Sequence, residues 1–382
     1  MSVTQQMGVF QQPAKEIAGN SVIKESTLTM LLKNKACCLA LIISTGLFVL
    51  TACEKFDRSK IAMPKIHFIT SDNLHSVICF DNSHTWIFGN YGTIFFSSDG
   101  GNTWNRQESG VEVLLGDAAF VSANEGWAVG VAGTVIHTAD GGKTWKKQAS
   151  STGKDLFNVF FLDAQNGWAV GEYGTIIHTG DGGKTWVNQV EPNDALYNNV
   201  YFADPLTGWV VGEFGTILHT TDGGKTWTPQ ECKDIVPVIT AKEWDRPKPA
   251  LYGIFFLDKN QGWITGMDGV IIHTTDGGQN WKKLHSGSDK PIYSILVEGK
   301  KGWAVGNKGT YLVSADGGNT WDAKGDAIKS KFWLRQISFC DENNGFVVGA
   351  MGTVAATTDG GKSWKVISGF SYDMPEFGLA DF

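Results

Sequence analysis

Arginine is scarce in this chain, and its scarcity excludes one broad class of partner. The 382 residues include four arginines, at positions 58, 106, 246 and 335. The formal net charge is −7, and no run of basic residues interrupts the acidic balance. Proteins that bind nucleic acid carry basic patches that neutralise phosphates. We therefore expect no nucleic-acid partner.

The short motifs of common enzyme classes are also missing. The sequence contains no Gly-x-Ser-x-Gly elbow, no His-Glu-x-x-His pair and no phosphate-binding loop. It has no Cys-x-x-Cys spacing of the kind that binds zinc. We expect no catalytic residue, no metal site and no cofactor.

What the sequence contains in abundance is one turn motif, Asp-Gly-Gly, with a tryptophan five residues after the aspartate. The motif occurs seven times, at intervals of 41, 41, 41, 54, 40 and 43 residues. A regular period of this length indicates a repeat architecture. The aspartates are Asp99, Asp140, Asp181, Asp222, Asp276, Asp316 and Asp359.

One repeat contains four short β-rich runs separated by turn residues, at 158–163, 167–171, 175–179 and 184–187. A Gly-x-x-Gly link joins the second run to the third and favours a tight hairpin. A four-stranded unit of this length, repeated radially, is a β-propeller blade. The sequence therefore predicts an all-β fold, a seven-bladed β-propeller of four-stranded antiparallel blades over residues 74–368.

The seven aspartates allow two interpretations. A calcium loop needs several oxygen ligands at alternating positions, and one aspartate beside two glycines does not supply them. An aspartate can instead accept hydrogen bonds from N–H groups ahead of it, while glycine adopts positive φ at little cost. We expect these turns, which we call Asp boxes, to be structural rather than metal-binding or catalytic.

Four histidines occupy one repeat position, three residues before the aspartate, in the second to fifth repeats. Equivalent positions in neighbouring blades should lie too far apart for two ligands of one metal ion. Other repeats place Phe96, Val313 and Ala356 there, which favours a packing role. The histidines are His137, His178, His219 and His273.

Two cysteines fall in the first strands of the first and seventh blades, which should be neighbours in a closed ring. Aligned with the third repeat, Cys79 matches Phe161 and Cys340 matches Leu162. Successive residues of a strand point to opposite faces. We therefore expect Cys79 and Cys340 to be buried free thiols rather than a disulfide.

The N-terminal region resembles an export signal. Residues 30–52 contain a short basic stretch, an apolar run and a boundary of small residues. The ending Leu50-Thr51-Ala52-Cys53 resembles a bacterial lipobox, so we expect Cys53 to be lipidated; the alternatives are a plain signal peptide or an uncleaved anchor. We expect export across the inner membrane and anchoring that favours the outer membrane or a periplasm-facing surface.

The flanking segments complete the predicted organisation. Residues 1–29 are expected to be disordered or to precede a true start at Met30. Residues 53–73 are expected to form a tether, and residues 369–382 a C-terminal tail.

The longest interval between repeats points to a binding face. It places about thirteen extra residues in Pro229–Ala250, between the outer strand of blade 4 and the inner strand of blade 5. Such connections share a face with the Gly-x-x-Gly hairpins, whose tips carry acidic and aromatic residues. We expect a protein client on this face, although the tips could also be ordinary solvated turns. The candidate residues are Tyr91, Glu172, Tyr173, Glu213, Phe214, Asp268, Trp244 and Arg246.

Repeats of the form Gly-Trp-Ala-Val-Gly-x-x-Gly-Thr-Ile-x-His-Thr-x-Asp-Gly-Gly-x-Thr-Trp resemble the photosystem II stability/assembly factor family. Residues 167–186 and 208–227 are near-ideal copies. The resemblance implies a non-enzymatic seven-bladed propeller that binds a membrane-protein precursor. In photosynthetic members an arginine-rich patch is associated with that binding. Because only Arg106, Arg246 and Arg335 lie in this propeller, the resemblance favours a membrane or envelope client other than a photosystem.

Asp boxes also occur in sialidases, which gives the alternative function of a glycan-binding or glycan-hydrolysing propeller. Sialidases hold the substrate carboxylate with three arginines and use a tyrosine nucleophile. All three propeller arginines would have to converge for that chemistry. Arg106 and Arg246 fall in variable segments between repeats, so we favour a binding scaffold.

Overall fold

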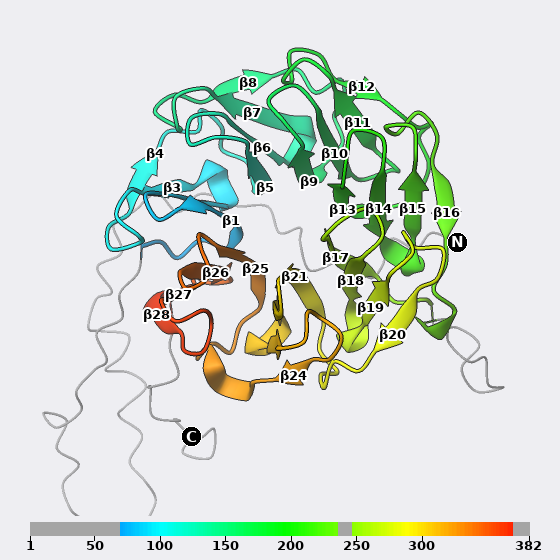
Figure 1. Cartoon of the computed structure of the whole chain (residues 1–382). Coiled ribbons are helices and arrows are strands. Elements are labelled where there is room, and N and C mark those ends of the chain that lie inside the picture. The colour runs from blue at the N-terminus through cyan, green and yellow to red at the C-terminus, as the bar shows by residue number, and fades with distance from the viewer. Residues whose placement is uncertain (1–68, 236–246, 370–382) are drawn as a thin grey trace, which may run out of the picture. The chain divides into compact units, whose positions relative to one another are not determined.

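Each repeat folds into one four-stranded antiparallel sheet, and the seven sheets form a ring (Figure 1). The computed structural model describes residues 69–235 and 247–369. Every sheet uses four consecutive strands of the chain, ordered from the centre of the ring outward. The predicted seven-bladed propeller is confirmed, and within the described residues each blade uses only its own four consecutive strands.

The inner strands are β1 (Leu74–Asp81), β5 (Leu115–Phe120), β9 (Leu156–Phe161), β13 (Tyr197–Phe202), β17 (Leu251–Phe256), β21 (Ile292–Glu298) and β25 (Leu334–Phe339). The second strands are β2 (His84–Gly89), β6 (Gly126–Gly130), β10 (Gly167–Gly171), β14 (Gly208–Gly212), β18 (Gly262–Gly266), β22 (Lys301–Gly306) and β26 (Gly345–Gly349). The third strands are β3 (Ile94–Ser97), β7 (Thr134–Thr138), β11 (Ile176–Thr179), β15 (Ile217–Thr220), β19 (Ile271–Thr274), β23 (Tyr311–Ser314) and β27 (Val354–Thr357).

The outer strands are shorter: β4 (Asn105–Gln107), β8 (Lys146–Gln148), β12 (Val187–Asn188), β16 (Thr228–Gln230), β20 (Lys282–Leu284), β24 (Asp322–Ala323) and β28 (Lys365–Ser368). The helical segments of the described chain are single 3-10 turns: η2 (Asn90–Gly92), η3 (Val131–Gly133), η4 (Glu213–Gly215), η5 (Lys233–Ile235), η6 (Met267–Gly269), η7 (Asn307–Gly309) and η8 (Gly325–Ala327). Within residues 69–235 and 247–369, no helix is long and apolar enough to cross a membrane.

Each Asp box is a turn capped by its own aspartate. In the third repeat, Asp181 Oδ1 accepts a hydrogen bond from the Thr185 backbone N–H at 2.9 Å, and Oδ2 accepts one from the Thr185 hydroxyl at 2.7 Å. The two glycines after Asp181 have φ values of 75° and 79°, which other residues rarely adopt. The Thr185 backbone and side-chain hydrogen bonds lower the pKa of Asp181 to about 2.

A tryptophan on the second strand of one blade joins that blade to the next. The ring of Trp127 stacks on Phe161 of the following blade, with 3.7 Å between ring centroids and 8° between planes. Its indole N–H donates to the Gly182 carbonyl of that blade's Asp box at 3.1 Å. Burial of a large aromatic ring and a satisfied N–H make this junction both apolar and specific.

The same pattern recurs at neighbouring junctions. Trp168 stacks on Phe202 at 3.6 Å, and Trp209 stacks on Phe256 at 3.7 Å. The in-register histidines pack on the other side of these tryptophans, as His178 does on Trp168 at 4.7 Å. Burial lowers the pKa of His178, so the ring is neutral at pH 7 and suits this packing role.

The prediction of free thiols at Cys79 and Cys340 is wrong, because the two residues form a disulfide. Their Cα atoms lie 4.8 Å apart, and the bond joins blade 1 to blade 7. Cys340 follows directly after β25, which ends at Phe339, so the alternation of a strand does not set its direction. The pairing of β1 with β2 is also irregular between Cys79 and Asp81.

Replacing Trp127 with alanine tests the junction. Trp127 is fully buried, so we expect Trp127→Ala to lower the free energy of unfolding by about 3 to 5 kcal/mol. Val187→Ala, at an exposed position of β12, is the control and should change it by less than about 0.5 kcal/mol. Chemical denaturation monitored by tryptophan fluorescence measures both. Equal small losses in the two variants would contradict the role of the stack.

Candidate functional site

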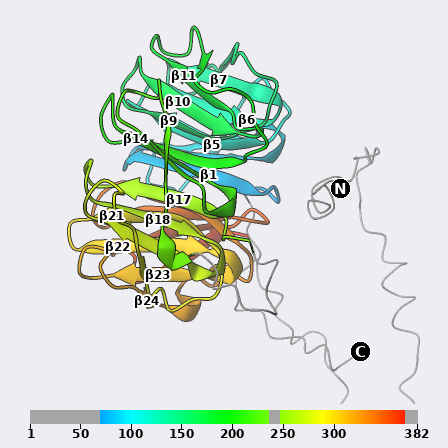
Figure 2. The same cartoon turned by 90° about the vertical axis from the view of Figure 1, so that its right-hand side faces the viewer.

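One face of the ring gathers the hairpins between second and third strands and the loops that lead into the inner strands. Antiparallel order places both kinds of connection at the same end of every blade, and the Asp boxes at the opposite end. Figure 2 shows the ring from its side, between these two faces. We call the first surface the hairpin face.

The hairpin tips hold side chains in a costly backbone conformation. The third residue of each Gly-x-x-Gly link has φ between 52° and 57°. A left-handed conformation costs a non-glycine residue roughly 1 to 2 kcal/mol. The seven positions hold Tyr91, Ala132, Tyr173, Phe214, Asp268, Lys308 and Met351.

Several of these tips expose apolar side chains to solvent. Tyr91 is 65% exposed, Phe214 59% and Tyr173 49%. Of the nine exposed large hydrophobic residues among those described, five lie at hairpin tips, including Met267 and Met351. Folding gains little from an exposed aromatic ring in a strained conformation. These side chains therefore form the strongest candidate contact surface.

The predicted acidic residues lie beside the aromatic tips. Glu172 and Glu213 each precede an aromatic tip residue, and burial raises the pKa of both carboxyl groups. Asp155 adds to the rise at Glu172 through like-charge repulsion. Lys154 lies over the Tyr173 ring, with Nζ 4.1 Å from its centroid. The rim of the face thus combines aromatic surface with charge of both signs.

The insertion between blades 4 and 5, within Pro229–Ala250, approaches the same face through the residues at its two ends that the structure describes. The Pro249 carbonyl accepts a hydrogen bond from the Gly215 N–H of the blade 4 hairpin at 2.9 Å. The predicted residues Trp244 and Arg246 lie outside the described residues.

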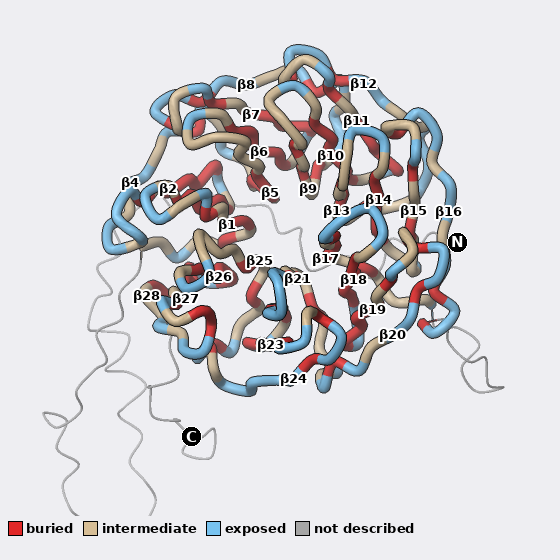
Figure 3. Tube along the Cα trace, viewed as in Figure 1, coloured by how far each residue is buried: buried red, intermediate tan, exposed pale blue. Residues whose placement is uncertain are grey.

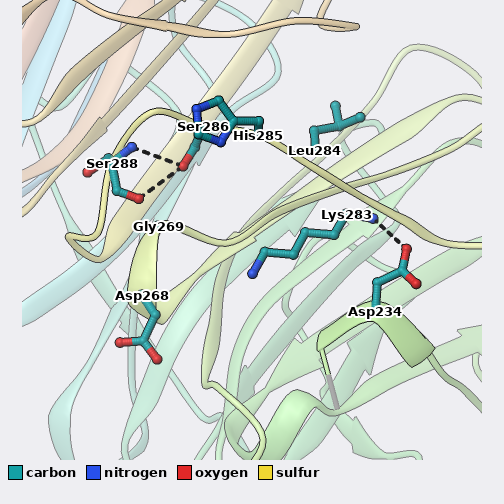
Figure 4. Close-up of a pocket in the computed structure, with 8 residues that line it drawn as sticks. All are labelled: Asp234, Asp268, Gly269, Lys283, Leu284, His285, Ser286 and Ser288. Atoms are coloured by element: carbon teal, nitrogen blue, oxygen red, sulfur yellow. Dashed lines mark hydrogen bonds between the residues drawn. The ribbon is translucent and has the colours of Figure 1, made fainter. Parts of the chain in front are cut away.

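A pocket of about 440 Å³ lies between η5 of this insertion and the blade 5 hairpin. Its walls include Asp234, Asp268, Lys283, His285 and Ser286 (Figure 4). The Lys283 backbone N–H donates to Asp234 Oδ2 at 3.1 Å, which ties η5 to β20. Among the described residues, no group of three or more His, Cys, Asp or Glu side chains could hold a metal ion.

A second set of residues, absent from the predicted site, surrounds the centre of the ring. The pairing of each inner strand with its second strand is irregular at its start, as between Leu74 and Ser76. Such a bulge turns one side chain out of the regular alternation. We call these seven positions the bulge residues: His75, Gly116, Phe157, Asn198, Tyr252, Tyr293 and Arg335.

Arg335 shows that bulge residues of different blades approach one another at the inner strands. Its guanidinium lies over the Tyr293 ring of blade 6 at 5.5 Å, and it interacts electrostatically with Tyr252 of blade 5 and Asp117 of blade 2. Burial lowers the pKa of Arg335, and among the described residues it forms no ion pair or hydrogen bond. A half-buried cation with aromatic neighbours suits an anionic or aromatic group of a partner.

The neighbouring bulge residue of blade 1 stays uncharged. Burial lowers the pKa of His75 to about 4, against the opposing hydrogen bond with Asn90. Its ring stacks on Trp333 at 5.5 Å, and Nε2 lies 2.8 Å from Asn90 Oδ1 of the blade 1 hairpin. This bond links the channel lining to the hairpin tips.

One residue further along several inner strands, polar side chains bind the inner edge of the next blade. Asp117 Oδ2 accepts a hydrogen bond from the Val159 N–H, and Asn158 Oδ1 accepts one from the Val200 N–H at 3.1 Å. These bonds satisfy N–H groups that an edge strand would otherwise leave unpaired. Burial raises the pKa of Asp117 to about 6, although Ser76 and other donors favour the ionised form.

Comparison with known proteins identifies related sequences. A family model described as photosynthesis system II assembly factor YCF48 matches residues 103–194, 187–298 and 289–375. The photosystem II assembly lipoprotein Ycf48 of Synechococcus sp. (strain CC9902) is 45% identical over 42 residues. That alignment spans 10% of this chain and only 13% of the relative's length.

Solved structures share the fold. A structure described as YCF48 bound to D1 peptide is 22% identical, with a TM-score of 0.63, over 77% of this chain and 95% of the other. A GH74 xyloglucanase from Xanthomonas campestris is 12% identical, with a TM-score of 0.61, over 77% of this chain and 53% of the enzyme. At these identities the likeness supports the fold alone.

Asp117 gives a pH dependence that can be tested. Because its pKa is raised in the folded protein, the folded state binds more protons between pH 4 and 6, and this contribution to stability is lost as the pH rises. Asp117→Asn removes the effect. We expect the free energy of unfolding of the variant, relative to the parent, to increase by roughly 1 to 1.5 kcal/mol from pH 5 to pH 8.

Asp204→Asn is the matched control for this measurement. Hydrogen bonds from Leu206 and Thr207 hold the pKa of Asp204 below its usual value despite an opposing burial effect. Asp204 is therefore ionised in both states above pH 5. Urea denaturation at pH 5 and pH 8 measures the free energy of unfolding of each variant relative to the parent. A difference for Asp117→Asn that is the same at both pH values would refute the raised pKa of Asp117.

Proposed function

Because the chain belongs to the photosynthesis system II assembly factor YCF48 family, we propose that it is a scaffold that binds a segment of another protein on its hairpin face. The observation that carries this proposal is the set of exposed apolar tips held at positive φ around one face. A solved relative with this fold is described as bound to a D1 peptide, which shows that one such propeller accepts a polypeptide.

The charges of the face favour an extended polypeptide of mixed character. Tyr91, Tyr173 and Phe214 provide apolar contacts at the rim, and Glu172 and Glu213 stand beside them. Arg335 provides positive charge at the channel. Such an arrangement suits a client with apolar residues and charges of both signs, taken from a membrane or envelope protein.

The hydrolytic alternative receives little support from the positions of the arginines. Arg106 is exposed on the outer strand β4, whereas Arg335 is half-buried on the inner strand β25; Figure 3 marks both strands. These two lie at opposite radial edges of their blades and cannot share one substrate carboxylate with a third arginine. We therefore propose a non-enzymatic scaffold rather than a hydrolase of the sialidase type.

Replacing two tips together tests the proposed surface. We expect Tyr173→Ser with Phe214→Ser to weaken client capture by about tenfold or more, since aromatic anchors dominate interface energies. A photo-reactive amino acid placed at Tyr91, in envelope membranes from the native cells, measures capture as crosslinked protein. The matched control is Leu206→Ser, which removes an exposed apolar side chain from a loop on the opposite face. Capture that is unchanged by the tip variants, or lost equally in the control, would overturn the proposed site.

We further propose that the chain is exported and anchored through a lipid on Cys53. The lipobox supports this proposal, although Cys53 lies outside the described residues. Cys53→Ser should move the protein from the membrane fraction to the soluble fraction of the envelope, because lipid chains supply the membrane affinity. Fractionation and immunoblotting measure the shift, with Cys232→Ser as the control. Membrane association that persists in Cys53→Ser would exclude the lipid anchor.

A further inference from the structure

We propose that the junction between blades 1 and 7 is a redox-controlled seam, which the Cys79–Cys340 disulfide closes and which opens first when that bond is reduced. Two features carry the proposal: this junction lacks the indole hydrogen bond that the other six share, and the disulfide joins the two blades at this junction.

The first missing device is the indole hydrogen bond. At six junctions a second-strand tryptophan donates its N–H to an Asp-box glycine of the next blade, as Trp303 does to Gly360 at 3.1 Å. At the seventh junction Phe346 occupies the tryptophan position and has no N–H to donate.

The second missing device is the aromatic stack. At five of the other six junctions the tryptophan stacks on the aromatic residue that ends the next inner strand, as Trp127 does on Phe161. At the blade 5–6 junction Trp263 packs in a core with Val297 instead. At the seam that position is Cys79, which offers no ring to Phe346. Cys340 and Ala356 pack beside this core, and Phe346 meets blade 1 through an edge-on contact with Trp104 at 5.7 Å rather than through a stack.

The chain itself does not strengthen this junction. Consecutive blades are joined covalently by the loop between them, whereas blades 1 and 7 lie at opposite ends of the propeller sequence. Neither blade lends a strand to the other. The disulfide joins residues 261 positions apart and so supplies the covalent link that the backbone lacks. Closing so long a loop strongly restricts the unfolded chain.

Hydrogen bonds across the seam remain when the disulfide is broken, so reduction need not unfold the blades themselves. The Cys79 N–H donates to Ser338 Oγ at 3.0 Å, and Asn82 Nδ2 donates to Asp341 Oδ2 at 2.6 Å. Because the reduced seam has neither the indole hydrogen bond nor a covalent link between its two blades, it becomes the weakest junction of the reduced ring. Cys340 is only half-buried, which gives a small dithiol access to the bond.

The redox step exchanges two electrons. Formation of the bond joins the two Sγ atoms, and the two electrons and two thiol protons pass to the disulfide of an oxidant such as a thiol–disulfide oxidoreductase, which becomes a dithiol. This chemistry proceeds in an exported, oxidising compartment and is opposed in a reducing cytosol. The ring would therefore close fully only after export.

The experiment uses the full chain expressed in an oxidising envelope. Thiol alkylation of the denatured protein should leave Cys79 and Cys340 unlabelled unless a reductant is added first. Reduction should lower the melting temperature by about 10 °C. Hydrogen exchange on the reduced, still folded protein should accelerate in β1, β2, β25 and β26 before the other inner strands.

Matched variants separate the covalent bond from its packing. Cys79→Val with Cys340→Leu installs the side chains that Val297 and Leu162 provide at equivalent positions, and it should reproduce the fast exchange at the seam without a reductant. Cys232→Ser removes the buried cysteine that lies outside the disulfide, and it should leave hydrogen exchange at the seam unchanged. Labelling of both seam thiols without reduction, or an exchange pattern in the reduced protein that is uniform around the ring, would overturn the proposal.

Discussion

The fold depends on one repeated contact, a second-strand indole that stacks on the next blade and donates to the carbonyl of its Asp box. At Trp127 this single side chain touches the inner strand through Phe161 and the turn through Gly182. The Asp box is therefore part of the joint between blades, because its capped geometry places that carbonyl. Asp181 holds the turn, the turn positions the acceptor, and the acceptor orients the indole. Loss of the aspartate cap, the turn or the indole weakens the contacts that depend on it, which explains why the motif recurs with so little change.

The opposite face is free to vary because it takes no part in this joint. The tip position of the hairpins changes from blade to blade, from Tyr173 to Asp268 to Lys308, while its backbone conformation stays the same. A rigid ring with constant backbone geometry can present different side chains without refolding. The hairpin face is thus variable in chemistry but fixed in shape, which suits recognition of a partner.

Sequence reasoning succeeded where the period carried the information. The blade count follows from the spacing of the aspartates, and Tyr173 and Phe214 could be placed at hairpin tips because glycines bracket them. It failed where a local irregularity of a strand decides which way a side chain points. The bulges at Arg335 and Tyr252 recur in every inner strand, but no residue type repeats there to mark them in the sequence. In addition, β25 ends one residue before Cys340, so strand alternation does not apply to that residue. A signal was available for Arg335, since a charged residue among apolar strand positions requires a partner or a purpose.

Closure of a ring poses a problem that a linear repeat does not solve. Six junctions form between neighbours that the chain already holds close, so association there costs little entropy. The seventh must join the two ends, and in this chain it also has the weaker pair, Phe346 against Cys79. A uniform repeat would place a tryptophan and a phenylalanine here as well. Their replacement by a smaller pair leaves room for a disulfide, so the break in the repeat and the covalent bond are two parts of one solution to closure.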